Sequence, residues 1–478
     1  MEPVIGLEVH AELLTRSKIF CACSATFGGE PNTNVCPVCL GMPGLLPVLN
    51  RRVIEFAIRL GLATSCAIAP LSRFARKNYF YPDLVKGYQI SMYELPLCTG
   101  GHLDVLVDGL GRRIGLTRIH MEEDTGKNIH EANAETSLVD FNRSGVPLLE
   151  IVSEPDMRTV AEAGAYLRTL RSILQYLEIC DGNMEEGSFR CDANVSVRPA
   201  GTTTLGTKVE VKNMNSFRSV ENAIAYEIER QAAALAHGEP LRQETRLWDA
   251  EREETRPMRS KEFAHDYRYF PEPDLLPLVV DRRWVDEVRA TLPELPAPRR
   301  ERFVRDYQLS TYDADVLTQR KDIADYFEAG IAAGAVPKEM ANWVTTELLR
   351  IVHEEKLDDA LVIRDWPLTP TQLARLAALV HAGTINRNTA KALIPRLRGT
   401  TRDPQELVAA EGLAQVSDRG ALEAAVADVV ARHPAQVAEF RGGKERVLGF
   451  LVGQVMKATG GKANPQVVQE LMRAALGT

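Results

Sequence analysis

The sequence contains no run of about 18 apolar residues, the length that a membrane-spanning helix needs. Its first residues lack the basic segment and the apolar segment of a secretory signal. We therefore expect no membrane span and a cytoplasmic location. The net charge of −8 argues against a protein that binds nucleic acid over its whole surface, although it leaves room for a local basic patch.

Familiar nucleotide-binding and hydrolase motifs are also absent. The sequence has no Gly-x4-Gly-Lys-Ser/Thr loop and no Gly-x-Gly-x-x-Gly turn. It has no His-Glu-x-x-His or Gly-x-Ser-x-Gly motif either, so the usual arguments for zinc or serine hydrolases do not apply. Spacing alone therefore gives no indication of ATP use.

The length of 478 residues is too great for one hydrophobic core and suggests about three domains. Strand and helix periodicities mix up to about residue 290, the segment Leu292–Pro298 has the composition of a linker, and strand patterns are scarce after it. We predict an α+β fold, with a mixed, largely antiparallel domain over residues 1–292 followed by two small all-α domains, 293–402 and 403–478.

Local patterns predict several elements of the first domain. Apolar and polar residues alternate from Ile5 to Leu13, which is typical of a half-buried strand. Asn50, Thr159 and Ser216 each precede an apolar stripe at helical spacing, so we expect them to cap helices. Two alternating runs between Phe189 and Lys212 predict a β-hairpin.

Four of the eight cysteines have the spacing of a metal knuckle. Cys21 and Cys23 form one close pair, and Cys36 and Cys39 form the second. Two such pairs can supply four thiolates to a tetrahedral structural zinc, with no open position for catalysis. The alternative is four reduced cysteines with a structural role.

Polar residues at every second position of the predicted strands are candidates for a site. Glu8 and His10 share one side of the first strand, close enough to hold one ion. The polar face of the hairpin carries both charge signs and an amide, on Arg190, Asp192, Asn194, Ser196, Lys208, Glu210 and Lys212. This mixture suits phosphates and a divalent cation, although solvated sheet faces have similar compositions.

Two further acidic segments are candidates for magnesium, which prefers carboxylate oxygens and water. Residues 122–124 are three successive carboxylates, for which an exposed acidic turn is the alternative. Glu150 lies in an apolar run, where a lone carboxylate needs a partner.

Several blocks of the sequence resemble the B-subunit family of the glutamyl-tRNA(Gln)/aspartyl-tRNA(Asn) amidotransferases. These blocks are Val4–Leu13, Arg76–Leu84, Lys86–Ser91, His120–Asp124, Val139–Leu148, Glu150–Asp156, Gly187–Val197, Glu210–Ser216 and Asp266–Asp274. Together they cover most of residues 1–280 in order. Gly460–Pro465 is similar to the tail domain of that family, but that motif is weaker.

The resemblance implies a cradle-shaped catalytic domain, a helical domain and a small helical tail that binds tRNA. It implies a three-subunit complex with a glutaminase A-subunit plus a small C-subunit, and the misacylating synthetase is a further candidate partner. In that family, ATP and magnesium serve to phosphorylate the side chain of Glu or Asp on misacylated tRNA. Ammonia from glutamine then displaces the phosphate.

Carried onto this sequence, the resemblance implies a magnesium pocket of Glu8, His10, Glu123 and Glu150, with Asp192 and Asn194 beside it. Candidates for the tRNA acceptor end or phosphates are Lys77, Tyr79, Tyr81 and Lys86, by charge and stacking surface. For these four, a basic-aromatic strand edge is the alternative. Two other functions remain open: a tRNA-binding scaffold that has lost catalysis, and a free-standing kinase of small carboxylates.

Overall fold

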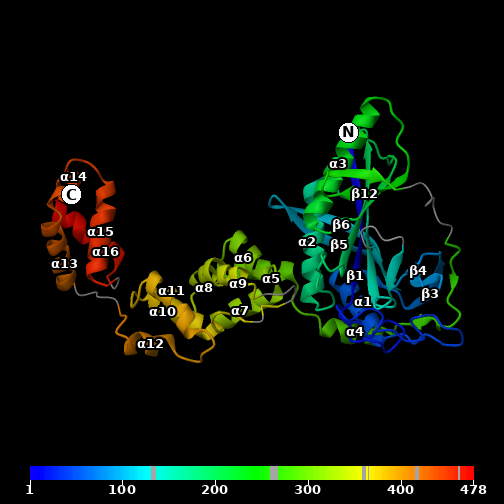
Figure 1. The fold of residues 1–478 in the computed structure, drawn as a ribbon, viewed down its shortest axis with the longest axis horizontal. Coiled ribbons are helices and arrows are strands. Elements are labelled where there is room, and N and C mark those ends of the chain that lie inside the picture. Colours follow the sequence, from blue (N-terminus) through cyan, green and yellow to red (C-terminus); the bar gives the residue numbers. More distant parts are fainter. Residues whose placement is uncertain are drawn as a thin grey trace. The chain divides into compact units, whose positions relative to one another are not determined.

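The computed structural model describes residues 1–130, 136–258, 267–357, 362–363, 365–414, 419–460 and 463–477 (Figure 1). These residues form two compact units, Met1–Pro296 and Ala297–Thr478. The first combines a large, mostly antiparallel sheet with helices and the second is helical, so the predicted α+β class is confirmed. Among the described residues, no helix is both long and apolar enough to cross a membrane.

One large sheet organises the first unit. Its main path runs β13 (Glu254–Pro257), β12 (Glu244–Asp249), β11 (Val209–Lys212), β10 (Phe189–Arg198), β1 (Glu2–Glu12), β9 (Pro147–Ser153), β6 (Leu110–Glu123), β4 (Tyr88–Leu95), β3 (Leu71–Asn78) and β14 (Phe270–Pro271). Off this path, β5 (Cys98–Val107) pairs with β6 and with β2 (Ala67–Ile68), and β15 (Leu278–Val279) pairs with β3. A separate hairpin joins β7 (Lys127–His130) to β8 (Ser137–Asp140). Among these pairs β11–β12 is parallel, and the others are antiparallel.

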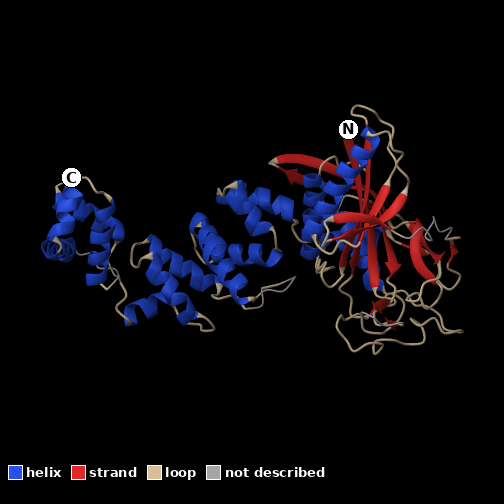
Figure 2. Ribbon diagram, turned by 45° about the horizontal axis from the view of Figure 1, so that its top comes forward, coloured by secondary structure: helices blue, strands red, loops and turns tan. Residues whose placement is uncertain are grey.

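Helices α1 (Arg51–Ala63), α2 (Val160–Tyr176), α3 (Phe217–Ala236) and α4 (Arg282–Ala290) complete the first unit. Asn50 and Ser216 accept hydrogen bonds from the first turns of α1 and α3, as predicted. Thr159 and Glu162 form the predicted capping box of α2. Figure 2 shows helices gathered along one side of the strands.

The two faces of the sheet differ because side chains alternate along each strand. On β1, Leu7, Val9 and Ala11 are at most 1% exposed and belong to the core that also contains the apolar faces of α1, α2 and α3. Glu8 and His10 lie between them and point to the opposite face. One face of the sheet is therefore closed by helices, and the other is left for polar side chains.

All the regular elements that the structure describes in the second unit are helices. Its elements are α5 (Pro296–Tyr307), α6 (Thr311–Thr318), α7 (Lys321–Ala332), α8 (Pro337–Trp343), a π-helical turn at Val344–Leu348, α9 (Leu349–Glu355), α10 (Pro370–His381), α11 (Arg387–Leu397), α12 (Pro404–Ala410), α13 (Arg419–Arg432), α14 (Pro434–Arg441), α15 (Arg446–Ala458) and α16 (Pro465–Leu476). Helix α5 begins inside the segment expected as a linker, since proline fits the first turn of a helix. Buried apolar residues form one cluster between Phe303 and Val408 and another between Leu422 and Leu476. The boundaries between the three predicted domains remain a prediction.

Candidate functional site

Strand register assembles a cluster of histidines and carboxylates on the open face of the sheet. Glu150 on β9 lies between His10 on β1 and His120 on β6 in directly paired positions. Glu8 and Glu122 flank this row on the same face. We call these five residues the metal cluster, since Glu8, His10 and Glu150 form one group of potential ligands within 4.8 Å, and His120, Glu122 and Glu150 form another.

Short distances join the members of the metal cluster. His10 Nε2 lies 3.5 Å from Glu150 Oε2, 3.7 Å from Glu122 Oε1 and 3.9 Å from Glu8 Oε1. His120 Nε2 lies 3.7 Å from the same oxygen of Glu150 and 3.8 Å from Glu122 Oε2. Three carboxylates and two imidazoles therefore surround one small volume.

The charges of the metal cluster depend on one another. Burial favours the neutral form of Glu150, but the positive charges of His120 and His10 hold its pKa below its usual range. Burial also works against the imidazolium of His10, but the contact with Glu150 and the charge of Glu122 outweigh it and raise the pKa of His10 to about 9. Burial and the charge of Glu150 raise the pKa of Glu8. The proton of His10 thus compensates part of the carboxylate charge.

Buried atoms without hydrogen-bond partners show that the metal cluster fits a divalent cation. Both ring nitrogens of His120 and the Oε2 atom of Glu122 are buried without a hydrogen bond. Such an unpaired group costs about 1–3 kcal/mol, and a cation among the carboxylates would satisfy Nε2 of His120 and Oε2 of Glu122. Imidazole ligands suit zinc, iron, copper and nickel, whereas carboxylates suit magnesium and manganese, so the donor set does not by itself fix the ion.

His120 is a site residue that the sequence analysis missed, and Glu122 was named there only within the acidic run 122–124. A signal was present, because His120-x-Glu122 repeats, in reverse order, the alternate spacing of Glu8-x-His10. Such spacing places both side chains of each strand on one face. Only the pairing of β6 with β9 brings the two motifs together.

The structure does not bring Glu123 together with Glu8, His10 and Glu150. Adjacent residues of a strand point to opposite faces, so Glu123 faces away from Glu122. Its carboxylate pairs with Lys86 Nζ and accepts a hydrogen bond from the backbone N–H of Ile90 at 2.9 Å. In the metal cluster, its neighbour Glu122 lies where Glu123 was expected.

The residues predicted on the hairpin occupy the open face beside the metal cluster. Asp192 pairs with Glu8 in the register of β10 and β1, and it accepts a hydrogen bond from Lys212 Nζ at 2.9 Å. Asn194 follows on β10 opposite Gly6, and its Oδ1 atom is buried without a hydrogen bond. The hairpin thus continues the polar face of β1.

Two other cations predicted on the hairpin lie at its ends. Arg190 pairs with His10 in register, and its guanidinium donates to Asp124 Oδ2 at 2.8 Å. Lys208 is exposed and directly precedes β11. Arg190 is therefore engaged by a carboxylate in this structure, whereas Lys208 is open to solvent.

Three of the four candidates for the tRNA acceptor end lie at the end of β3. Lys77 Nζ is 4.8 Å from the ring centre of Tyr267 and 5.9 Å from that of Tyr79. Burial, together with the charge of Glu122, raises the pKa of Tyr79, so this ring lies within electrostatic range of the metal cluster. Tyr81 is 48% exposed. Lys86, the fourth candidate, is engaged by Glu123 on the opposite face.

An arginine that the sequence analysis did not single out touches the metal cluster. Arg118, two residues before His120 on β6, donates to Glu150 Oε1 at 3.1 Å. Its guanidinium carbon lies 4.7 Å from the ring centre of Tyr93, and that ring stacks at 4.9 Å on Tyr269. The sequence signal for Arg118 was its position two residues before His120, which places both side chains on the same face of β6.

The cysteine quartet is a second potential metal centre. The Sγ atoms of Cys21, Cys23, Cys36 and Cys39 lie within 4.8 Å of one another, as the predicted metal knuckle requires. A hydrogen bond from Cys21 holds the pKa of the Cys39 thiol near 4, against the opposing effect of burial. Lys18, whose side chain is fully buried, places Nζ 3.6 Å from Cys39 Sγ. The quartet therefore fits a metal ion.

Comparisons with known proteins establish the family. Residues 3–286 match the model of the GatB/GatE catalytic domain, and residues 325–476 match that of the GatB domain. The chain therefore belongs to the GatB/GatE family, which confirms the resemblance seen in the sequence blocks.

The similar relatives match this chain over nearly the whole length of both chains. Three of them are the B subunits of the aspartyl/glutamyl-tRNA(Asn/Gln) amidotransferases of Solidesulfovibrio magneticus, Thermodesulfovibrio yellowstonii and Geobacter sulfurreducens. They are 58%, 55% and 57% identical to this chain. In each case at least 98% of both chains is covered, so the likeness extends beyond the catalytic domain to the helical part.

Proposed function

We propose that this chain is the subunit of a tRNA-dependent amidotransferase that activates the side-chain carboxylate of Glu-tRNA(Gln), Asp-tRNA(Asn) or both. A carboxylate oxygen attacks the γ-phosphorus of ATP, the bond to the bridging oxygen breaks, and ADP leaves. Ammonia then attacks the acyl carbon, the carbon–oxygen bond breaks, and phosphate leaves with loss of one proton to give the amide. The metal cluster is the observation that carries this proposal.

A magnesium ion held by Glu8, His10, Glu122 and Glu150, with His120 beside them, would neutralise charge on the phosphates of ATP. The chain's own residues have separate tasks. Asp192 and Lys212 fix the neighbouring strand and its charge through their ion pair. Asn194 and Lys208 continue the polar face of β10 and β11, where phosphate oxygens and the substrate need donors, and Arg190 lies beside them in its ion pair with Asp124.

Lys77, Tyr79 and Tyr81 are proposed to receive the acceptor end of tRNA. A cation beside two phenol rings offers both phosphate binding and base stacking. Their place at the end of β3, with Tyr79 in the electrostatic field of Glu122, would bring the aminoacyl group toward the metal cluster. Lys86 is left out of this set, because Glu123 already neutralises it.

The remaining assignments concern the assembly. The relatives' designation as B subunits implies a complex of several chains. We propose that its other members are a glutaminase A-subunit plus a small C-subunit, with the misacylating synthetase as a further partner. We propose a structural zinc in the cysteine quartet, tRNA binding by the tail domain, and a cytoplasmic location.

One experiment tests the proposed activity against its two rivals. ADP formation is measured with the purified chain and with the complete complex, each with and without misacylated tRNA. We expect cleavage that requires the tRNA and is fastest in the complex. Cleavage without tRNA or partners would favour the free-standing kinase of small carboxylates. Binding of tRNA without any cleavage would favour the scaffold.

A further inference from the structure

The contacts of Arg118 place a fixed positive charge at the edge of the metal cluster. One nitrogen of its guanidinium donates to Glu150 at 3.1 Å. Another, Nε, is buried and has no hydrogen-bond partner. The side chain as a whole is 21% exposed, so it is not closed off from solvent. Arg118 therefore has donor capacity to spare at the place where Glu150 meets the histidines.

The surroundings of Arg118 explain why it is held there. Tyr93 on β4 covers the guanidinium, and the ring of Tyr93 stacks on Tyr269 with an interplanar angle of 11°. The guanidinium of Arg118 thus packs against Tyr93, the first of two stacked tyrosine rings that come from distant parts of the chain. A planar guanidinium stacks on such a ring and still directs its N–H groups sideways, which an ammonium cannot do.

The charges of the open face call for such a group. The metal cluster brings together Glu8, Glu122 and Glu150, and Asp192 lies next to Glu8. A triphosphate approaching them meets repulsion that cations must offset. Lys212 and Arg190 are both bound to carboxylates, at 2.9 Å and 2.8 Å. Arg118, by contrast, contacts Glu150 of the metal cluster and still has one donor, Nε, without a hydrogen-bond partner.

We propose that Arg118 binds the phosphoryl group while it passes from ATP to the side-chain carboxylate of the aminoacyl-tRNA. This inference rests on the proposed function and adds a residue to it. As the bond from the γ-phosphorus to ADP breaks and the bond to the carboxylate oxygen forms, negative charge spreads over the non-bridging oxygens. Arg118 donates hydrogen bonds to these oxygens and keeps its own proton throughout.

The test compares Arg118→Gln and Arg118→Lys in the complete complex. Arg113, on the same strand but paired with Asp104 at the surface, provides the matched control Arg113→Gln. We expect Arg118→Gln to lower kcat for tRNA-dependent ADP formation by about 100-fold or more, the effect of removing one donor to a transition state. Arg118→Lys should have a kcat between those of Arg118→Gln and the wild type. In both Arg118 variants the KM for misacylated tRNA should change less than about threefold, and glutamine hydrolysis should match the wild type. The control Arg113→Gln should match the wild type in every measurement.

A magnesium titration separates this role from mere positioning of Glu150. If Arg118 only oriented that carboxylate, Arg118→Gln would need more magnesium, and saturating magnesium would restore kcat. Such recovery would overturn the proposal, as would wild-type kcat in Arg118→Gln. The expected result is a low kcat at saturating magnesium that added guanidinium ion partly rescues in Arg118→Ala. Failure of the proposed function would look different, because the wild-type complex itself would then show no tRNA-dependent ADP formation.

Discussion

Glu122 and Glu123 are neighbours in the chain, yet the sheet gives them different surroundings. Glu122 contacts both histidines of the metal cluster, whereas Glu123 pairs on the other face with Lys86, whose side chain is 9% exposed. Neither the charge nor the burial of these two residues distinguishes them, since both are 3% exposed. Only the direction of the side chain does. Substituting each in turn therefore tests the assignment of the site.

We predict that Glu122→Gln and Glu150→Gln lower tRNA-dependent ADP formation by about 100-fold or more, since each removes a charged ligand while preserving volume. Glu123→Gln should leave the magnesium dependence of ADP formation unchanged. It should instead lower the free energy of unfolding by about 3 kcal/mol, because the charge of Lys86 stays buried without its partner. Magnesium titrations and urea unfolding measure the two effects. A raised magnesium requirement in Glu123→Gln alone would contradict the assignment.

Lys18 allows a second residue-scale prediction, about the cysteine quartet. Four thiolates on one divalent ion carry excess negative charge, and the buried Nζ next to Cys39 offsets part of it. We expect Lys18→Met to lose zinc to a competing chelator about 10-fold more readily than the wild type, a usual effect of removing a group that contacts a metal ligand. Lys444→Met, at an exposed lysine, is the control. The measurement is the zinc content of each protein after chelator treatment. Equal zinc retention in Lys18→Met and in the wild type would contradict this role of Lys18.

At the scale of elements, the cap of α2 sets one end of a helix that packs into the core of the sheet. Thr159→Ala removes the side-chain acceptor for the backbone N–H of Glu162, which lies 3.1 Å away. We expect a loss of about 1 kcal/mol in the free energy of unfolding of the first unit. Thr204→Ala, in an exposed loop, should change it by less than about 0.5 kcal/mol. Urea midpoints followed by circular dichroism compare the two variants.

The elements themselves were largely predictable from sequence, because their signals are local. Alternation along Ile5–Leu13 and the caps at Asn50, Thr159 and Ser216 depend on residues a few positions apart. The site was only partly predictable. Glu8, His10 and Glu150 stand out by spacing and context, but His120 joins them through the pairing of β6 with β9. That register depends on tertiary packing, and a shift of one residue would exchange Glu122 for Glu123.

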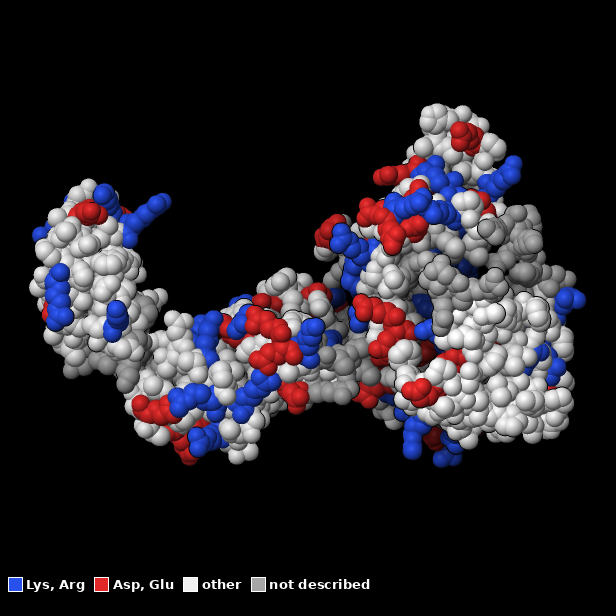
Figure 3. All heavy atoms as spheres, in the orientation of Figure 1, with Lys and Arg blue, Asp and Glu red and all other residues white. Residues whose placement is uncertain are grey.

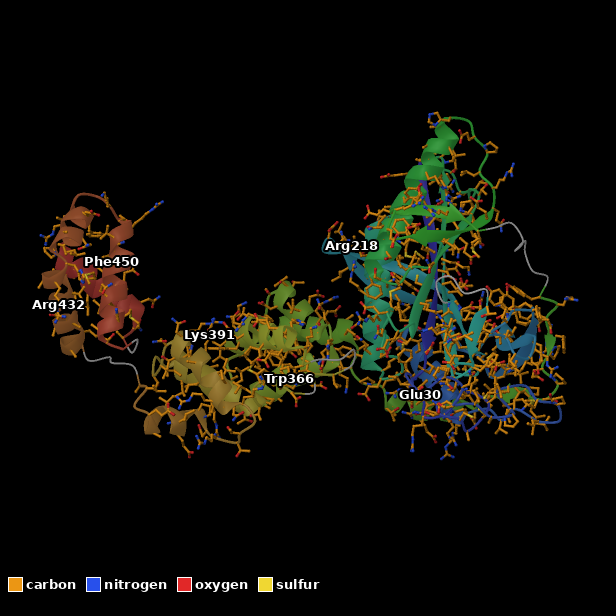
Figure 4. All side chains as sticks on the ribbon, viewed as in Figure 1. Glu30, Arg218, Trp366, Lys391, Arg432 and Phe450 are labelled. Carbon is orange, nitrogen blue, oxygen red and sulfur yellow. The ribbon has the colours of Figure 1, made fainter. Side chains whose placement is uncertain are left out.

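At the scale of the whole molecule, the charge of the tail contrasts with that of the chain. From Arg441 to Thr478 there are six basic and two acidic residues, while the complete chain has a net charge of −8. Figure 3 shows basic side chains on α13–α16, and Figure 4 labels Arg432 and Phe450 there. Arg441, Lys444, Arg446 and Lys457 are exposed, and Lys462 lies outside the described residues. A solvated helical face is the alternative to a surface that binds tRNA.

Deleting residues 419–478, which comprise α13–α16, tests that alternative and leaves in place the apolar cluster that ends at Val408. If three or four of the basic side chains meet phosphates, the slope of log affinity against log salt concentration should become shallower by about 2 to 4 units. The deletion should leave ADP formation intact at saturating tRNA, because the metal cluster lies wholly in the first unit. Binding of tRNA at several salt concentrations, with the other chains of the complex present, gives the slopes. Identical slopes would reject the tail as a tRNA contact.

The position of β1 has a consequence for synthesis of the chain on the ribosome. This strand comes first in the sequence but lies between β9 and β10, which begin at Pro147 and Phe189. At about 5–20 residues per second, roughly 7–30 seconds pass before β9 is made. During that time the apolar residues of β1 have no native partner strand. The metal cluster therefore cannot be complete until β9, in the second quarter of the chain, has been made.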